Sequence, residues 1–388
     1  MVRRLPVESL PVPPRTGTVS GAGHGEEMET EPEAIEELRA RHLLPPSWSP
    51  EDRATFLSPT PEVDYRSKYR GSLLAGAAGD ALGRPAEGIP ASEVRRRYGT
   101  LEDFQPWRNW RRGPVGTITD DTQMTMCVAE SIVAHGHLVP GDLAERFIAW
   151  LPVGRGKGRT CVGAIERLES GEPWYRAGLP SAGNGAAMRV APVGLRHASE
   201  LDALRREAAL SAVVTHADPM AVTSAVAQAF SVAYLLHRPA GSLDVQDYLV
   251  SLQAVLADVH DPGAPERRTG AGRGAVRLAD RLVEVGDMLD LTPAEAFACL
   301  WNGAFVLESL PAALWCFLHS PEDPEQVLVT AANQGRDADT VAAMAGNLVG
   351  AYLGEAVLPR RWLDDLEYAA ELRELADRLC ELAEMDRL

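Results

Sequence analysis

The chain has 388 residues, of which 45% are hydrophobic, so it can bury one large core or two ordinary ones. Its 38 basic and 55 acidic side chains give a formal net charge of −17, which argues against a general nucleic-acid-binding protein because such proteins present a basic surface. No uninterrupted apolar run approaches the roughly 20 residues that span a bilayer. Prolines follow Arg3 and Arg4 where a signal peptide would be apolar. We therefore expect neither a membrane protein nor a secreted one.

Five cysteines are scattered along the chain without a CxxC pair: Cys127, Cys161, Cys299, Cys316 and Cys380. An odd number of cysteines in mostly apolar helical stretches is typical of reduced thiols packed in a core. We therefore expect buried thiols and a cytoplasmic protein.

Residues 1–64 differ in composition from the rest of the chain. The segment is rich in Pro, Gly and Glu and poor in large apolar residues, so it cannot bury enough surface to offset its ordering entropy. We predict a flexible N-terminal extension over 1–64, in which EAIEELRARHLL at 33–44 is able to form one short helix.

From Tyr65 onward, apolar residues recur at helical spacing and period-two alternation is absent. Alanine is abundant, which favours helices and close helix packing. We predict a single all-α domain over 65–388, with functional loops at helix ends and a flexible loop at 261–274. The clearest helical patterns cover 67–82, 122–136, 141–151, 219–237 and 341–354.

The stretch TITDDTQMTM at 117–126 places two aspartates side by side where a helix begins. Thr119 or Asp120 can cap that helix, and Gln123 has the spacing of a capping box. A cap accounts for one carboxylate only. If Asp120 and Asp121 converge, they repel each other, and a cation would relieve the repulsion.

A second acidic turn, NQGRDADT, opens the long helical pattern that ends near residue 354. Either Asp339 caps this helix, or Asp337 and Asp339 lie in an extended loop and point to one side. With Thr340, the two turns offer four carboxylates and two hydroxyls. Such hard oxygen ligands suit Mg²⁺ or Mn²⁺, and two acids on each of two loops are able to hold two ions.

Three further stretches carry polar residues at helix ends. In 71–88, Asp80 is a candidate structural acid, and Glu87 is either a solvated loop residue or a catalytic carboxylate. The turn Gly183-Asn184-Gly185 opens onto a predicted helix, where backbone N–H groups suit a phosphate. His216 precedes another helix, as a structural residue or a ligand contact.

Taken in order, these stretches resemble the ADP-ribosylglycohydrolase family, which includes the dinitrogenase reductase-activating glycohydrolases. The resemblance covers about 66–355 and rests on five motifs: GxxGDALGxPxE at 76–87, TDDTQMT at 119–125, GNGAAMRVAP at 183–192, THADP at 215–219 and GRDADTVAAMAGNLVGA at 335–351.

The resemblance implies an all-α orthogonal helical bundle in which loops at helix N-termini form a binuclear Mg²⁺ or Mn²⁺ site. The implied metal ligands are Thr119, Asp120, Asp121, Asp337, Asp339 and Thr340. The implied catalytic carboxylates are Glu87, Asp120, Asp121 and Asp339, and the implied ADP-ribose contacts are Gly183, Asn184, Gly185, Ala186 and His216. Many members read GGDTDT where this chain has Arg336 and Ala338, which bears on ligand selectivity more than on metal binding.

The implied function is hydrolysis of the C1″ glycosidic bond that joins ADP-ribose to a protein side chain, with arginine as the favoured acceptor. An ADP-ribosylated protein or a small ADP-ribose conjugate is then the substrate. One alternative is an ADP-ribose-binding or immunity protein without strong catalysis, whose extension engages a toxin partner. Another is a helical scaffold with acidic caps. A local arginine patch keeps a nucleic-acid partner open: Arg95, Arg96, Arg97, Arg108, Arg111 and Arg112.

Overall fold

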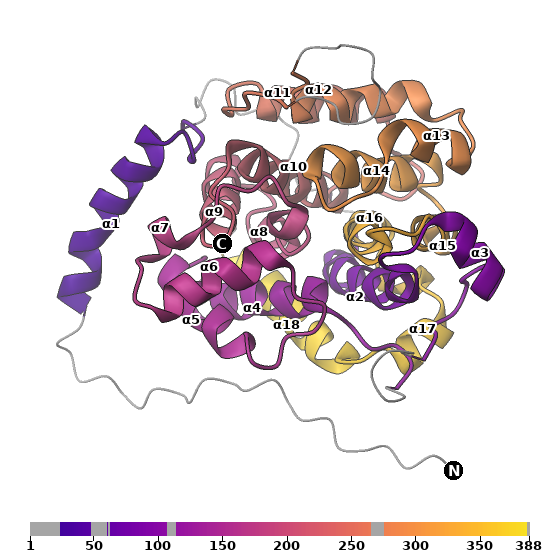
Figure 1. The fold of residues 1–388 in the computed structure, drawn as a ribbon, viewed down its shortest axis with the longest axis horizontal. Helices are drawn as coiled ribbons and strands as arrows, with labels where there is room; N and C mark the ends of the chain where they lie inside the picture. Colours follow the sequence, from indigo (N-terminus) through magenta and orange to yellow (C-terminus); the bar gives the residue numbers. More distant parts are fainter. Residues whose placement is uncertain (1–23, 48–59, 61–62, 107–113, 265–274, 386–388) are drawn as a thin grey trace.

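The computed structural model describes residues 24–47, 60, 63–106, 114–264 and 275–385, with side chains from residue 32 onward. These residues form an all-α fold, as the sequence predicts, and their only β-type contacts are isolated bridges (Figure 1). The α-helices are α1 His24–Ala40, α2 Tyr65–Gly83, α3 Ala91–Tyr98, α4 Asp120–His135, α5 Pro140–Trp150, α6 Arg159–Glu169, α7 Trp174–Ala177, α8 Ala191–Arg196, α9 Leu201–Val213, α10 Pro219–Leu236, α11 Val245–Leu256, α12 Leu278–Val283, α13 Pro293–Leu300, α14 Val306–His319, α15 Pro324–Ala332, α16 Ala338–Leu353, α17 Arg360–Asp365 and α18 Ala369–Met385. Short 3₁₀ turns are η3 Arg84–Ala86, η4 Asn184–Ala186, η5 Glu284–Met288 and η6 Glu355–Val357.

The five clearest helical patterns are confirmed as α2, α4, α5, α10 and α16. Their starts follow local capping chemistry in several cases. Asp218 accepts a hydrogen bond from the Met220 N–H at the start of α10, and Asp64 accepts one from the Ser67 N–H at the start of α2. Side-chain caps of this kind satisfy N–H groups that have no partner inside the helix.

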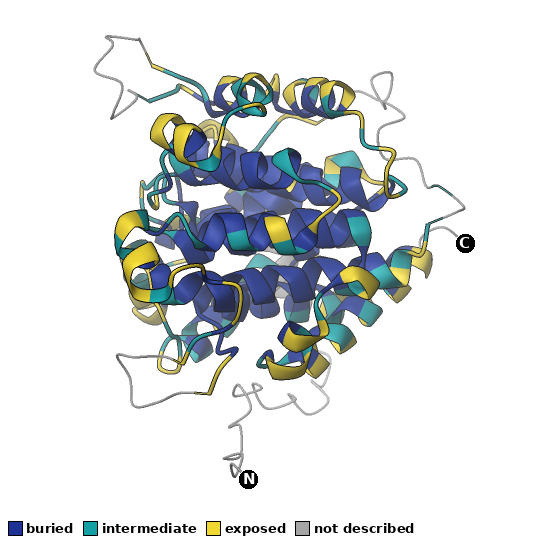
Figure 2. Cartoon of the chain, turned by 90° about the vertical axis from the view of Figure 1, so that its right-hand side faces the viewer, coloured by how far each residue is buried: buried dark blue, intermediate teal, exposed yellow. Residues whose placement is uncertain are grey.

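The core is built on helices that are buried along nearly their whole length, chiefly α2, α10, α14 and α16. Figure 2 shows these central helices as buried, with exposed residues gathered on peripheral helices and turns. Among the described helices, α10 alone is long and apolar enough to cross a membrane, and 94% of it is buried inside the protein. A central core helix has the same composition.

Helices α2 and α16 run antiparallel in close contact because glycine faces backbone along the seam. A Cβ added to Gly71 would lie 2.5 Å from the carbonyl oxygen of Gly350 at one end. At the other end, a Cβ added to Gly83 would lie 2.6 Å from the Cα of Asp339. The close approach therefore fixes the end of α2 against the start of α16, where two of the sequence motifs lie.

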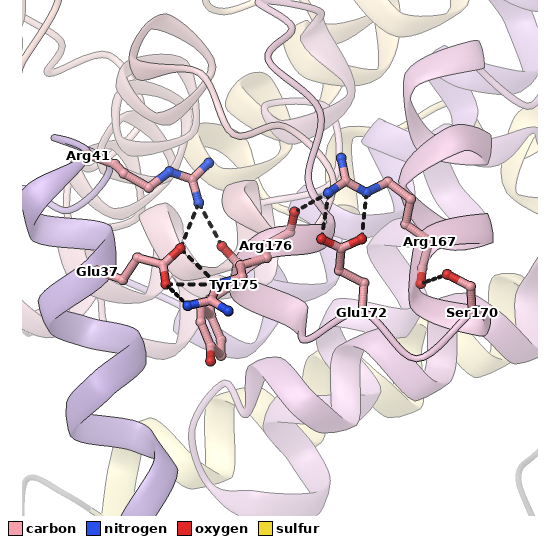
Figure 3. A network of polar contacts seen from close by, with 7 residues as sticks. All are labelled: Glu37, Arg41, Arg167, Ser170, Glu172, Tyr175 and Arg176. Carbon is pink, nitrogen blue, oxygen red and sulfur yellow. Dashed lines mark hydrogen bonds and ion pairs between the residues drawn. The ribbon is translucent and has the colours of Figure 1, made fainter.

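Part of the N-terminal extension packs on the helical domain. Within 32–47, the side chains of Leu38 and Leu43 are buried in the main core. The polar side of α1 faces α7, where Arg176 donates to both oxygens of Glu37 at 3.1 and 2.8 Å, and Arg41 donates to the Tyr175 carbonyl at 3.0 Å (Figure 3). Composition predicts a flexible extension over 1–64; in its described part, α1 and the turn after it contact the domain through the buried Leu38 and Leu43.

The predictions about the cysteines and the arginine patch can be compared with the structure. Four cysteines are buried as expected, but Cys299 is exposed, because it lies on the outer side of the short helix α13. In the arginine patch, Arg96 and Arg97 form ion pairs with Glu93 on their own helix. Arg108, Arg111 and Arg112 lie outside the described residues, as do 265–274 of the predicted loop.

Candidate active site

The two acidic turns meet in space. The carboxylate of Asp121, in the first turn of α4, accepts hydrogen bonds at Oδ2 from the Thr119 hydroxyl at 3.1 Å and from the Thr340 hydroxyl at 3.4 Å. Thr340 belongs to α16 and lies 219 residues further along the chain. The starts of α4 and α16 therefore form one acidic wall.

The helix starts differ in detail from the capping expected. Thr119 is the N-cap of α4 without a side-chain cap bond, and Gln123 forms no capping box. The Gln123 side chain instead accepts from the Trp150 indole at 3.1 Å and from the Arg155 N–H at 3.0 Å. In α16 the N-cap is Asp337, and Asp339 lies in the first helical turn. Both alternatives for these two acids are therefore wrong: Asp339 is not the cap, and the two acids do not lie in one extended loop.

Asp80 is the structural acid that the sequence indicated. From the last turn of buried α2 it accepts from the N–H of Thr119 at 2.9 Å and the N–H of Thr122 at 3.2 Å. It also accepts from both threonine hydroxyls, at 2.8 and 2.6 Å. One carboxylate of α2 thus satisfies the free donors at the start of α4 and holds that start beside α16.

A cleft of about 890 Å³ opens in front of the acidic wall. Most of the predicted site residues line it: Glu87, Asp120, Asp121, Gly183, Asn184, Gly185, His216, Asp337, Asp339 and Thr340. Thr119 and Ala186 do not line it. Thr119 is fully buried behind the wall, with its hydroxyl bonded to Asp80 and Asp121.

Glu87 is placed at the cleft by pairing of two loops. The Gly88 N–H donates to the Arg336 carbonyl at 2.6 Å, and the Arg336 N–H donates to the Ile89 carbonyl at 2.7 Å. This pairing holds Arg336 at φ 61°. Residues other than Gly, Asn and Asp seldom adopt this left-handed backbone region. The loop after α2 is therefore tied to the loop before α16.

The acids of the cleft raise one another's pKa. Burial is the main cause for Asp120, Asp121 and Asp339, whose pKa values lie well above the usual range, and neighbouring carboxylates add to it. Burial also raises the pKa of Asp337. For Glu87, which keeps solvent exposure at the mouth, the cleft walls and the charge of Asp337 raise the pKa. Arg84 lowers the pKa of Glu87, but its charge does not outweigh burial and the charge of Asp337.

The loop 183–186 lines the cleft and contacts the acidic wall at Asp337. It forms a three-residue 3₁₀ turn and not the start of an α-helix, so a helix dipole is not available there. The Asn184 N–H is bonded to the Ala304 carbonyl at 3.0 Å, and its side-chain amide donates to Asp337 Oδ2 at 2.5 Å. A Cβ on Gly185 would lie 2.6 Å from the His216 ring, so glycine lets the loop contact that histidine.

Sequence reasoning missed the wall formed by 301–308. Trp301, Phe305 and Glu308 line the cleft, and the guanidinium carbon of Arg336 stacks 3.1 Å from the centroid of the Trp301 ring. Trp301 also has φ 61°. No motif marks this segment, because its place depends on the Gly183–Phe305 bridge to the distant 183–186 loop.

The residues of the acidic wall fit a hard divalent cation in their chemistry. The donors are carboxylates and hydroxyls only, and Asp121 Oδ1 is buried without a hydrogen-bond partner in the described structure. Across the described residues, however, no three or more His, Cys, Asp or Glu side chains are grouped so that they could hold a metal ion. The acidic wall therefore has the donor chemistry that suits such a cation, although its carboxylates do not form such a group.

Comparison with known proteins identifies the family. A family model described as ADP-ribosylglycohydrolase matches residues 61–388, so the chain belongs to the ADP-ribosylglycohydrolase family and is a hydrolase of the glycosidase type. It is 31% identical to human ADP-ribosylhydrolase ARH3, over 81% of this chain and 93% of that protein.

Two other similarities agree with this assignment. The chain is 26% identical to ADP-ribosylarginine hydrolase Tri1 of Serratia proteamaculans, over 83% of this chain and 81% of that protein. A solved structure titled ADP-ribosylglycohydrolase-related protein complex shares the fold with a TM-score of 0.62 and 28% identity, over 82% of this chain and 99% of that chain. None of these names supports a toxin partner for the N-terminal extension.

Proposed function

We propose that this protein is a divalent-metal-dependent hydrolase that releases ADP-ribose by cleaving its C1″ glycosidic bond to a protein side chain. The observation that carries the proposal is the contact between Asp121 and Thr340, which joins two acidic turns at one wall of the cleft. The glycine loop 183–186 lines the same cleft. We assign the cations and ribose hydroxyls to the acidic wall and the diphosphate to the loop and His216, which lines the cleft beside it.

Six residues are the candidate ligands of two Mg²⁺ ions, or of Mn²⁺: Thr119, Asp120, Asp121, Asp337, Asp339 and Thr340. Thr119 alone among them does not line the cleft, and its hydroxyl would have to turn from Asp80 and Asp121 to reach an ion. Bound divalent ions would hold the ribose hydroxyls and lower the pKa of a water molecule. The buried, unpartnered Oδ1 of Asp121 and the all-oxygen donor set support this assignment.

The reaction needs a proton donor or acceptor beside an oxocarbenium-like transition state. Glu87 suits this task because its pKa is raised and it faces solvent at the mouth of the cleft. Asp120 also lines the cleft, and the Gly158 N–H holds its Oδ2 at 3.3 Å. His216 contacts the ligand from the loop side as a neutral ring, because burial and the charge of Arg189 lower its pKa to about 3.

Arginine is the favoured acceptor. A guanidinium is a cation, and Glu87 and the buried aspartates give the cleft a negative charge that would attract it. The name of the Serratia relative contains the same linkage. A small ADP-ribose conjugate is the second substrate class, and the cytoplasm is the proposed location because of the four buried thiols.

Release of free ADP-ribose from arginine-linked and serine-linked peptides tests the proposal. We expect hydrolysis with Mg²⁺ or Mn²⁺, faster on the arginine linkage, loss with EDTA, and restoration when the metal is returned. Asp120→Ala and Asp339→Ala should abolish activity in a folded protein. Full activity in both variants, or indifference to the chelator, would refute the metal assignment.

A further inference from the structure

Behind the 183–186 loop lies a buried cation without an acidic partner. The side chain of Arg189 is fully buried, and no carboxylate of the described chain pairs with it. Its guanidinium stands 4.8 Å from the Phe147 ring centroid. Because an uncompensated buried charge is costly, the contacts that Arg189 does make need an explanation.

Arg189 donates hydrogen bonds to the 183–186 loop, to the end of α9 and to the residue before His216. Nη1 donates to the Gly185 carbonyl at 3.0 Å. Nη2 donates to the Ser211 carbonyl at 2.7 Å and to the Thr215 hydroxyl oxygen at 2.8 Å. The Thr215 hydroxyl in turn lies 2.8 Å from Nδ1 of His216. One guanidinium therefore contacts both the 183–186 loop and Thr215, whose hydroxyl bonds to His216.

These contacts decide which ring nitrogen of His216 carries the proton. A guanidinium only donates, so the Thr215 oxygen accepts from Arg189. Within the described residues, Nδ1 of His216 is then the one acceptor that the buried Thr215 O–H meets. If Nδ1 carried the hydrogen instead, that hydroxyl proton would be left unpaired in a fully buried position, which is unfavourable.

We infer that Arg189 is a positioning residue that acts through Thr215 to keep the proton of His216 on Nε2, so that the ring presents an N–H donor to an anionic ligand. Nε2 faces the loop, since a Cβ on Gly183 would lie 3.2 Å from it. His216 also lines the cleft. The diphosphate of ADP-ribose is the anion, and in this respect the inference rests on the proposed function.

Nitrogen-15 NMR of histidine-labelled, ligand-free protein directly tests which ring nitrogen of His216 carries the proton. His216→Asn identifies the signals of His216 among the nine histidines. We expect the wild-type ring to be neutral, with the hydrogen on Nε2 and a bare, hydrogen-bonded Nδ1. Thr215→Ser keeps the hydroxyl and should keep this pattern, whereas the isosteric Thr215→Val should lose it. Arg189→Met should also weaken it, because the Thr215 hydroxyl is then released from its bond to the guanidinium.

Binding of ADP-ribose by calorimetry completes the test. Thr215→Val should raise the Kd roughly tenfold, as the loss of one charge-assisted hydrogen bond does, while Thr215→Ser stays near wild type. A wild-type His216 with its proton on Nδ1, or a Thr215→Val variant with unchanged signals and affinity, would overturn the inference. If His216 shows the expected tautomer but the protein binds no ADP-ribose, the proposed function is contradicted, whereas the action of Arg189 through Thr215 on His216 is still supported. If Arg189→Met does not fold, the comparison of Thr215→Ser with Thr215→Val still tests the inference.

Discussion

Charged side chains are arranged in opposite ways in two regions of this molecule. In the contacts that Figure 3 shows, acids face bases: Arg176 of α7 donates to Glu37 of α1, and Arg167 of α6 donates to Glu172 in the turn before α7. The hydrogen bond from Arg176 lowers the pKa of Glu37. In the cleft, acids face acids. Burial and mutual repulsion raise the pKa of Asp121, and one of its oxygens has no partner.

The difference separates contacts that hold the fold from contacts that serve chemistry. Opposite charges at a surface cost little to bring together and add little stability. Like charges in a buried wall oppose folding, so their presence indicates a function that needs them. Four variants sharpen or break this comparison.

Asp339→Asn is expected to have the largest effect. Removing one charge from the acidic wall should lower hydrolysis on the order of a thousandfold, because several kcal/mol of transition-state stabilisation depend on the wall. The thermal midpoint without divalent cation should stay the same or rise, since repulsion is relieved. Asp323→Asn, at the start of α15, is the matched control, because asparagine is an equally good N-cap. A strong loss of stability with activity retained would contradict the account.

Asp80→Ala should destabilise the fold more than substitution of any acid of the wall does. It removes the acceptor of the Thr119 and Thr122 N–H groups and of the Thr122 hydroxyl, and leaves the Thr119 hydroxyl with Asp121 alone. We expect the free energy of unfolding in urea to fall by about 3 kcal/mol. Wild-type stability would show that Asp80 belongs with the acids of the wall and not with the structural contacts.

Leu38→Ala measures how firmly the extension is held. The side chain is fully buried, and such a truncation costs about 2–3 kcal/mol where a buried leucine is well packed. Hydrogen exchange should accelerate in α1 and little in α4 or α16. Exposed Glu36→Ala on the same helix is the control. Equal exchange in both variants would mean that α1 does not depend on its apolar side.

Glu37→Ala should have the smallest effect. The Glu37 side chain keeps 24% of its surface in solvent, so the ion pairs with Arg176 and Arg41 contribute less than about 1 kcal/mol and weaken with salt. Urea unfolding at low and high salt checks this. A loss as large as that of Leu38→Ala would show that charge pairing, and not apolar burial, holds α1.

The sequence predicts what local chemistry determines. Apolar periodicity and alanine content were enough for the helices of the core. The paired acids of 120–121 and 337–339 mark helix starts because such residues favour the first turn. Glycines at 71 and 83 indicate close helix approach, and that approach brings two of the motifs together.

Sequence reasoning fails where a residue's role depends on a distant partner. Trp301 gives no local signal, because its place in the cleft follows from pairing of Phe305 with Gly183. In the sequence Arg189 is only one residue of a motif. Its contact with Thr215, on which its inferred role depends, is seen only in the structure. The extension has too few apolar residues to predict its docking from composition, yet Leu38 and Leu43 find a complementary surface.

The central claim is that the starts of α4 and α16 together bind divalent cations. Isothermal titration of Mg²⁺ or Mn²⁺ into chelator-treated protein tests it most directly. We predict saturable binding that Asp339→Asn and Asp121→Asn each abolish and that Asp323→Asn leaves intact. The absence of binding in the wild type, together with undiminished release of ADP-ribose in EDTA, would contradict it.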